Sequence, residues 1–121
     1  MTMNYIYGAQ ADRYSFIWIP KTLMTEKAFS AIQSGAKIAY GFLMDRMRYS
    51  LKNQWVDEDG FVYVIYPLDE IRKDIGISKK QAAECLAELE NAGLLERKSR
   101  GPGLPDRIYL KSIQLDKTRH G

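Results

Sequence analysis

The chain has 121 residues with 45% apolar and 27% charged side chains, ordinary values for one globular domain that exclude a disordered protein. No apolar stretch approaches the roughly 18–20 residues that a membrane span requires, and the start of the chain lacks the pattern of a signal peptide, so we expect a cytoplasmic protein. The net charge of +3 permits an anionic partner without requiring one.

The two ends of the chain lack the periodic patterns found in its middle. Residues 1–13 are polar and mixed, and residues 114–121 are similar, so we expect a flexible N-terminal arm and a flexible C-terminal tail or linker. The folded domain is therefore expected to span residues 14–113.

The first part of this domain predicts one strand and two helices. Tyr14–Ile19 is rich in aromatic and β-branched residues, which favour a strand, and Pro20 ends it. A helical turn is expected from Thr25. Apolar residues at three- and four-residue spacing then predict a long helix from Ser34 to about Lys52. Its wide apolar face is typical of a central core helix, and a second subunit is the alternative partner for part of that face.

The middle of the chain predicts a hairpin and a short helix. Asp57–Gly60 has turn chemistry within Trp55–Tyr66, and strand-forming residues follow it as far as Pro67. Leu68–Ile75 carries apolar residues at helical spacing and ends at Gly76. Glycine readily takes the left-handed conformation that is needed just past a helix end.

Another helix begins two residues after Gly76. Ser78 and Gln81 have the spacing of a capping box, in which each side chain accepts a hydrogen bond from the backbone of the other residue. Apolar residues at helical spacing up to Asn91 predict its buried face, which consists of Ala82, Cys85, Leu86 and Leu89.

The last third predicts a second hairpin. Leu94–Ser99 and Arg107–Lys111 are candidate strands, and Arg100–Asp106 between them is a loop rich in glycine and proline. Together with the two preceding helices, this order predicts an α+β fold. The fold is a winged helix-turn-helix with an N-terminal strand extension and a β-hairpin wing.

The helix from Ser78 has the position of a recognition helix, which enters the major groove of DNA in such folds. Lysine and glutamine can hydrogen-bond guanine and adenine edges, and a glutamate can accept from a cytosine amine. Any one of these side chains could instead be a solvated residue of an amphipathic helix, although DNA contact is favoured for the helix as a whole. The candidate contacts are Ser78, Lys79, Lys80, Gln81 and Glu84.

The wing region carries a second group of candidates. Between Leu94 and Lys111 basic residues outnumber acidic ones, so we expect contacts with DNA phosphates there. The alternative is an ordinary hairpin with surface charge. The candidate phosphate contacts are Arg97, Lys98, Arg100 and Arg107.

The sequence offers few of the side chains that a metal site, a cofactor site or a catalytic site requires. Cys85 is the only cysteine and His120 the only histidine, which argues against a disulfide, a zinc site and a Ser/His/Asp triad. A calcium loop around Asp57–Gly60 would need carboxylates where Trp55 and Tyr66 stand. We therefore expect no metal, no cofactor and no enzymatic activity.

Several separated motifs fall in one order along the chain. They are Ile19-Pro-Lys21, Ala36-Lys37 followed by Tyr40, Leu43-Met-Asp-Arg-Met47, Lys52-Asn53 with Trp55-Val-Asp57 and Gly60, and Gly93-Leu-Leu-Glu-Arg-Lys98. With these motifs the chain resembles the N-terminal domain of the replication initiator protein A family of Gram-positive plasmids. The resemblance covers about Tyr14 to Ile113, whereas a generic winged helix would match the helix-turn-helix alone.

The resemblance implies an initiator that recognises repeated sites in a plasmid origin, often as a dimer. A separate C-terminal domain, which we do not expect within this sequence, would engage the host replication proteins. By similarity, DNA-facing roles pass to Lys79, Lys80 and Gln81 and, near the wing, to Arg97, Lys98 and Arg100.

The wing departs from the family pattern at its tip. Where the family commonly has Gly-x-Gly-Lys-Pro-Asn, this chain reads Gly101-Pro-Gly-Leu-Pro-Asp106. It has lost a lysine and gained an acid, so we assign the phosphate contact to Arg100 and Arg107 instead.

Two other functions fit the same elements. A winged-helix transcription regulator would share the fold and the groove chemistry, and a protein-interaction module would use the N-terminal strand and the long helix. Steep salt dependence would separate DNA binding from the protein module. We also expect a homodimer, because Tyr14–Ile19 is an aromatic strand with an unpaired edge.

Overall fold

The computed structural model describes residues 3–8 and 13–113. The predicted tail, residues 114–121, lies outside the described residues, as do residues 1–2 and 9–12 of the predicted arm. In chain order the elements are α1 (Lys21–Thr25), the short 3-10 helix η2 (Lys27–Phe29), α2 (Ser34–Met47), β1 (Val64–Ile65), α3 (Leu68–Ile75), α4 (Lys79–Asn91), β2 (Leu95–Lys98) and β3 (Arg107–Leu110).

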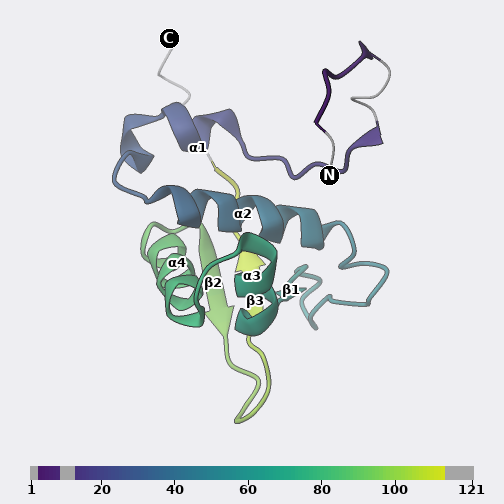
Figure 1. Cartoon of the computed structure of the whole chain (residues 1–121). Helices are drawn as coiled ribbons and strands as arrows, with labels where there is room; N and C mark the ends of the chain where they lie inside the picture. The colour runs from purple at the N-terminus through teal and green to yellow at the C-terminus, as the bar shows by residue number, and fades with distance from the viewer. Residues whose placement is uncertain (1–2, 9–12, 114–121) are drawn as a thin grey trace.

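The three strands form one antiparallel sheet in the order β1-β3-β2, and the connection between β2 and β3 is the wing. Figure 1 shows α2 crossing between α1 and the layer that α3, α4 and the sheet form, while the wing projects away from the helices. Val64, Leu95 and Ile108 are buried in the sheet. The predicted α+β winged helix-turn-helix is confirmed.

The core lies where α2, α3 and α4 meet the sheet. The stripe predicted for α4 is buried, with no member more than 3% exposed: Ala82, Cys85, Leu86 and Leu89. Leu23, Leu43 and Ile71 are buried with it on α1, α2 and α3. Each large apolar side chain buried in this way contributes about 1.5–3 kcal/mol. Among the described residues, no helix is long and apolar enough to cross a membrane.

The N-terminal segment differs from its prediction. Tyr14–Ile19 is extended but pairs with no described strand, so the predicted strand extension is not formed. Residues with strand propensity form a strand only where a neighbouring strand supplies hydrogen bonds. Here the side chains of Ile17 and Ile19 lie against Gly41 of α2 instead. α1 begins directly after Pro20, which occupies its N-cap position, rather than at Thr25.

The region after α2 also differs from its prediction. α2 ends at Met47 and turns follow as far as residue 54, because the chain must reverse to bring β1 beside β3. In the predicted hairpin, only one isolated bridge forms, between Val56 and Val62. The predicted strand before Pro67 is therefore reduced to the two residues of β1.

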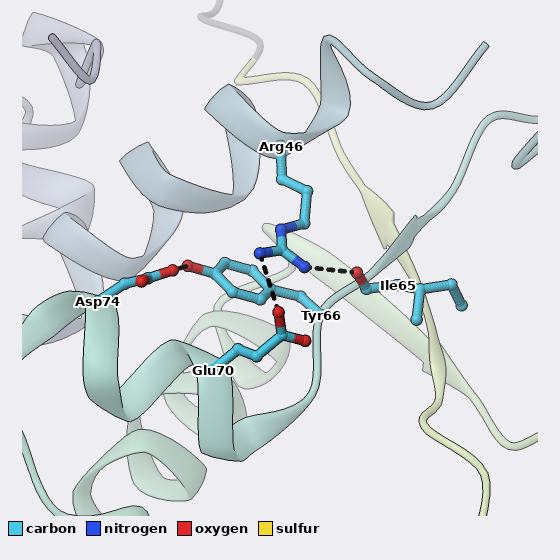
Figure 2. A network of polar contacts seen from close by, with 5 residues as sticks. All are labelled: Arg46, Ile65, Tyr66, Glu70 and Asp74. Atoms are coloured by element: carbon cyan, nitrogen blue, oxygen red, sulfur yellow. Dashed lines mark hydrogen bonds and ion pairs between the residues drawn. The ribbon is translucent and has the colours of Figure 1, made fainter. Parts of the chain in front are cut away.

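A polar network joins α2, β1 and α3, as Figure 2 shows. The guanidinium of Arg46 lies 3.8 Å above the ring of Tyr66 and donates to the carbonyl of Ile65 at 3.3 Å. It also forms an ion pair with Glu70 at 3.5 Å. The Tyr66 hydroxyl donates to Asp74, and burial together with this bond raises the pKa of Tyr66 above its usual range. The network fixes α3 against α2.

Gly41→Ala is expected to release the N-terminal segment from α2. A Cβ at Gly41 would lie 2.8 Å from Cγ1 of Ile19, whereas a Cβ at Gly35 would meet Cys85 Sγ at an ordinary 3.5 Å. The gain in helix propensity is up to about 1 kcal/mol at Gly41 in the interior of α2 and smaller at Gly35 in its first turn. We expect Gly35→Ala to raise the melting temperature, and Gly41→Ala to lose that gain and to speed chymotryptic cleavage at Trp18. If Gly41→Ala and Gly35→Ala were equally stable and were cleaved at equal rates, the contact between Gly41 and Ile19 would be refuted.

Candidate nucleic-acid interface

The turn between α3 and α4 fixes where α4 starts. Gly76 has φ 80°, and its N–H and that of Ile77 both donate to the carbonyl of Arg72, at 2.8 and 3.0 Å. Ser78 then caps α4 with the complete predicted capping box: the Gln81 N–H donates to Ser78 Oγ at 3.1 Å, and the Ser78 N–H donates to Gln81 Oε1 at 3.0 Å. α3 and α4 thus form a helix-turn-helix with a short, fully hydrogen-bonded turn.

The outer face of α4 begins with two lysines. Lys79 and Lys80 are exposed, and neither forms an ion pair or a hydrogen bond within the described part of the chain. Glu84 is exposed one turn later, and the half-buried Ala83 and Ala87 lie between the larger side chains. The face is therefore positive at its start and flat further along, so another surface can approach it closely.

The charges of α4 are reversed relative to the helix dipole. α3 follows the favourable pattern, with Asp69 and Glu70 in its first turn and basic residues in its last. α4 has no acidic residue in its first turn and no basic residue in its last. Lysines at a helix N-terminus cost typically about 0.3–1 kcal/mol each. Such a placement is expected where the N-terminus must meet an anion.

Two of the contact residues predicted at the start of α4 bond each other in the capping box. The capping box uses the hydroxyl of Ser78 and the side-chain carbonyl of Gln81. Bidentate recognition of adenine needs both the carbonyl and the amino group of a glutamine. Only the amino group of Gln81 remains available while the cap is intact, so the cap is its first role.

Arg97 points toward α4. Its backbone N–H donates to Glu90 Oε2 at 2.9 Å, and its guanidinium donates to Glu90 Oε1 through Nε at 3.0 Å and Nη2 at 2.9 Å. These bonds lower the pKa of Glu90. They join the end of α4 to β2, so a phosphate contact by Arg97 would have to compete with this ion pair. Sequence reasoning missed Glu90, because seven residues and a turn separate it from Arg97.

Lys98 and Arg107 are cross-strand neighbours at the base of the wing. Alternation along a strand places Arg107 on the opposite sheet face from the buried Ile108, away from the helices. There the Arg107 guanidinium lies 4.7 Å from the ring centroid of Tyr63, and the Lys98 ammonium lies 5.1 Å from that of Tyr109. Both cations are therefore separated from the outer face of α4 by the sheet.

The aromatic side chains that hold these cations were not predicted as part of any site. The Tyr109 hydroxyl donates to Asp57 Oδ2 at 2.9 Å, and Asp57 Oδ1 accepts from the N–H groups of Asp59 and Phe61. These backbone and hydroxyl bonds lower the pKa of Asp57 despite the opposing effect of burial. The only sequence signal was the turn chemistry of this acidic stretch, which does not reveal its contact with β3.

The wing ends in a tight turn. The Leu104 N–H donates to the Gly101 carbonyl at 3.3 Å, and Gly103 has φ 77°. Proline followed by glycine with positive φ is the pattern of a type II turn. Arg100 Nε donates to the Pro105 carbonyl at 2.8 Å and closes the base of this turn.

A hollow of about 390 Å³ separates the wing from the helix-turn-helix. Lys79 lines it from α4, Asp69 from α3, and Leu104 and Asp106 from the wing. The structure thus brings the first turn of α4 and the wing to one side of the domain. It leaves Lys98 and Arg107 on another.

Comparisons with known proteins agree with this geometry. The family described as replication initiator protein A (RepA) N-terminus matches residues 15–120. A "41 kDa protein" of Lactobacillus helveticus is 32% identical in an alignment of 119 positions that covers 93% of this chain and 34% of the relative. The chain therefore spans about a third of that relative's length.

Solved structures with the same fold include three similar domains. "N-Terminal domain of DNA binding protein" is 32% identical with a TM-score of 0.77, covering 96% of this chain and 88% of that one. "Structure of Rep-DNA complex" is 32% identical with a TM-score of 0.77, covering 94% and 88%. "Structure of MDR initiator" is 28% identical with a TM-score of 0.76, covering 94% and 90%.

Glu90→Gln is expected to reduce the acid sensitivity of folding. The pKa of Glu90 is lowered in the folded state, so its contribution to stability is complete above the unfolded pKa of about 4.3 and is lost as the pH falls through the folded value. The variant should melt below the wild type at pH 7, and the difference should shrink toward pH 3. Glu84→Gln, on the exposed face of α4, is the control. If the difference in melting temperature between the wild type and Glu90→Gln did not change with pH, the Glu90–Arg97 ion pair would not stabilise the fold.

Proposed function

This chain belongs to the family of replication initiator protein A N-terminal domains, and on that premise we propose that it binds double-stranded DNA at repeated sites in a plasmid origin to initiate replication. One observation carries the proposal. Lys79 and Lys80, without partners among the described residues, stand at a capped helix N-terminus on the side of the domain that the wing also faces. Duplex DNA offers the dense negative charge that such a surface would neutralise.

In this mechanism α4 enters the major groove with its first turn leading. Lys80 and Glu84 would reach base edges, where an ammonium can donate to guanine and a carboxylate can accept from cytosine. Lys79 faces the hollow beside the wing and would contact the phosphates that pass between the two. The small Ala83 and Ala87 would let the helix sit deep in the groove.

The remaining candidate residues take revised roles in this proposal. Arg100 keeps a phosphate contact, because only its Nε is engaged by the wing backbone in the described structure. Arg97 positions α4 against β2 through Glu90. Lys98 and Arg107 would touch DNA only where the backbone passes the outer sheet face. Specificity should thus depend on α4, and general affinity on Lys79 and Arg100.

Initiation itself requires more than DNA binding. We assign contacts with host replication proteins to a C-terminal domain, since this chain matches only 34% of the relative's length. Within this chain we propose a binding role rather than catalysis, in the cytoplasm, where plasmid DNA is found.

Footprinting on the parent replicon tests the proposal. We expect protection of a set of direct repeats at the origin, whereas a single protected promoter palindrome would instead identify a transcription regulator. Lys80→Glu should abolish the protection. The same variant should melt at or slightly above the wild-type temperature, because it restores a favourable charge at the helix N-terminus. Lys21→Glu, at the exposed first residue of α1, is the matched charge reversal at another helix N-terminus. Protection that survives Lys80→Glu would place another element in the groove.

We also propose that the chain forms a homodimer through its N-terminal segment. Tyr14, Phe16 and Trp18 alternate along it and are 58, 55 and 73% exposed. Their rings follow one another with centroids 6.4 and 6.3 Å apart. Aromatic side chains are enriched in protein interfaces, and a row of them left in water is unfavourable. A second copy of this chain would cover the row. The support is exposure, not the strand edge expected from sequence, since no strand forms.

Replacing Phe16 and Trp18 with serine is expected to convert the dimer to a monomer. Light scattering would measure the mass with and without the origin duplex. The paired change of Leu51 and Phe61 to serine removes comparable exposed apolar area elsewhere, and should leave the mass unchanged. A wild-type chain that stays monomeric both free and on a two-site duplex would refute the dimer.

A further inference from the structure

The tip of the wing is prefolded and apolar. The turn Gly101–Leu104 is closed by its own hydrogen bond, and Arg100 braces the residue after it. Pro102 is exposed and Leu104 is 54% exposed. Neither side chain belongs to the core. A turn that is held so firmly, with a half-exposed leucine at the hollow beside the helix-turn-helix, is not required by the packing of the core.

The cations near the wing flank the tip rather than occupy it. Lys79 and Asp106 line the hollow beside Leu104, as do two residues that are already ion-paired, Asp69 with Arg72 and Arg97 with Glu90. Arg100 stands at the base of the turn with its Nε bonded to the Pro105 carbonyl. A protein surface that met the tip would have to accept two cations beside an apolar contact. A duplex groove matches this arrangement better, because its two walls are rows of phosphates and its floor is formed by base edges and sugars.

We propose that Leu104 is a specificity-determining residue that enters the minor groove and packs against a deformable base step. The inference rests on the proposed DNA binding and extends it. The first turn of α4 and the wing line the same hollow, so with α4 in the major groove the wing would reach an adjacent minor groove. Apolar side chains in minor grooves act as wedges that partly unstack a step. Pyrimidine–purine steps unstack most easily.

Because the turn is rigid, a single leucine side chain is enough to pack against the base step. The type II geometry fixed by Pro102 and Gly103 is present before binding, so little conformational entropy is lost when the tip enters the groove. Because leucine carries no charge, its contact releases no counterions. The wing of this chain would thus select DNA by deformability, whereas a lysine at the same position would add salt-dependent affinity for any sequence.

The test uses the full chain and the duplex protected in the footprint, with 2-aminopurine at the step nearest the wing. Wild type should raise the 2-aminopurine fluorescence. Leu104→Ala should abolish the rise and weaken binding about tenfold without changing the salt slope. Leu104→Met should restore both. Leu104→Lys should bind with a salt slope steeper by about one unit and without the fluorescence rise.

A second duplex isolates the selection for deformability. Replacing the wing step with a stiff A-tract should weaken wild type by about tenfold, and should leave Leu104→Ala unaffected. Equal binding and fluorescence for wild type and Leu104→Ala would overturn the wedge while leaving the proposed function intact. Loss of self-association in Leu104→Ala, with DNA binding unchanged, would also overturn it by identifying a protein contact. A wild type that protects no duplex would refute the proposed function itself.

Discussion

The burial of one face of α4 is the constraint on which the rest of this structure depends. Leu86 and Leu89 hold the helix against the core, and Glu88 accepts a hydrogen bond from the Gln33 N–H at the start of α2, at 2.6 Å. At its far end Glu90 is bonded to Arg97 of β2. Glu88 and Glu90 flank the buried stripe on its two edges, so these contacts hold α4 in the orientation that presents Lys80 and Glu84 outward.

The outer side of α4 begins with charges that oppose the helix dipole. The same sequence builds α3 with acids first and bases last, so the reversed charges of α4 do not reflect a general composition. The capping box compensates in part, since it satisfies backbone donors at the terminus where Lys79 and Lys80 are unfavourable. An anion bound there would relieve the remaining repulsion between these lysines and the dipole.

Polar networks away from this surface determine how its parts are positioned. Arg46 and Tyr66 fix α3, the first helix of the helix-turn-helix, to α2. Asp57 and Tyr109 tie the loop before β1 to β3, the strand that leads out of the wing. Both networks join residues far apart in sequence, and both use an aromatic ring as a platform for a cation. One network joins the helices α2 and α3, and the other holds the loop before β1 against the sheet.

The sequence by itself determined the helix-turn-helix and the wing, because their signals are local. Gly76, the pair Ser78 and Gln81, and the glycines of the wing each act on the backbone within four residues. Tertiary structure alone decided which cations remain free for a ligand. Arg97 lies next to Lys98 in sequence, yet alternation along β2 turns one toward Glu90 and the other toward Tyr109. Tertiary structure also decided that Tyr14–Ile19 forms no strand, because no described strand lies beside it to supply the hydrogen bonds.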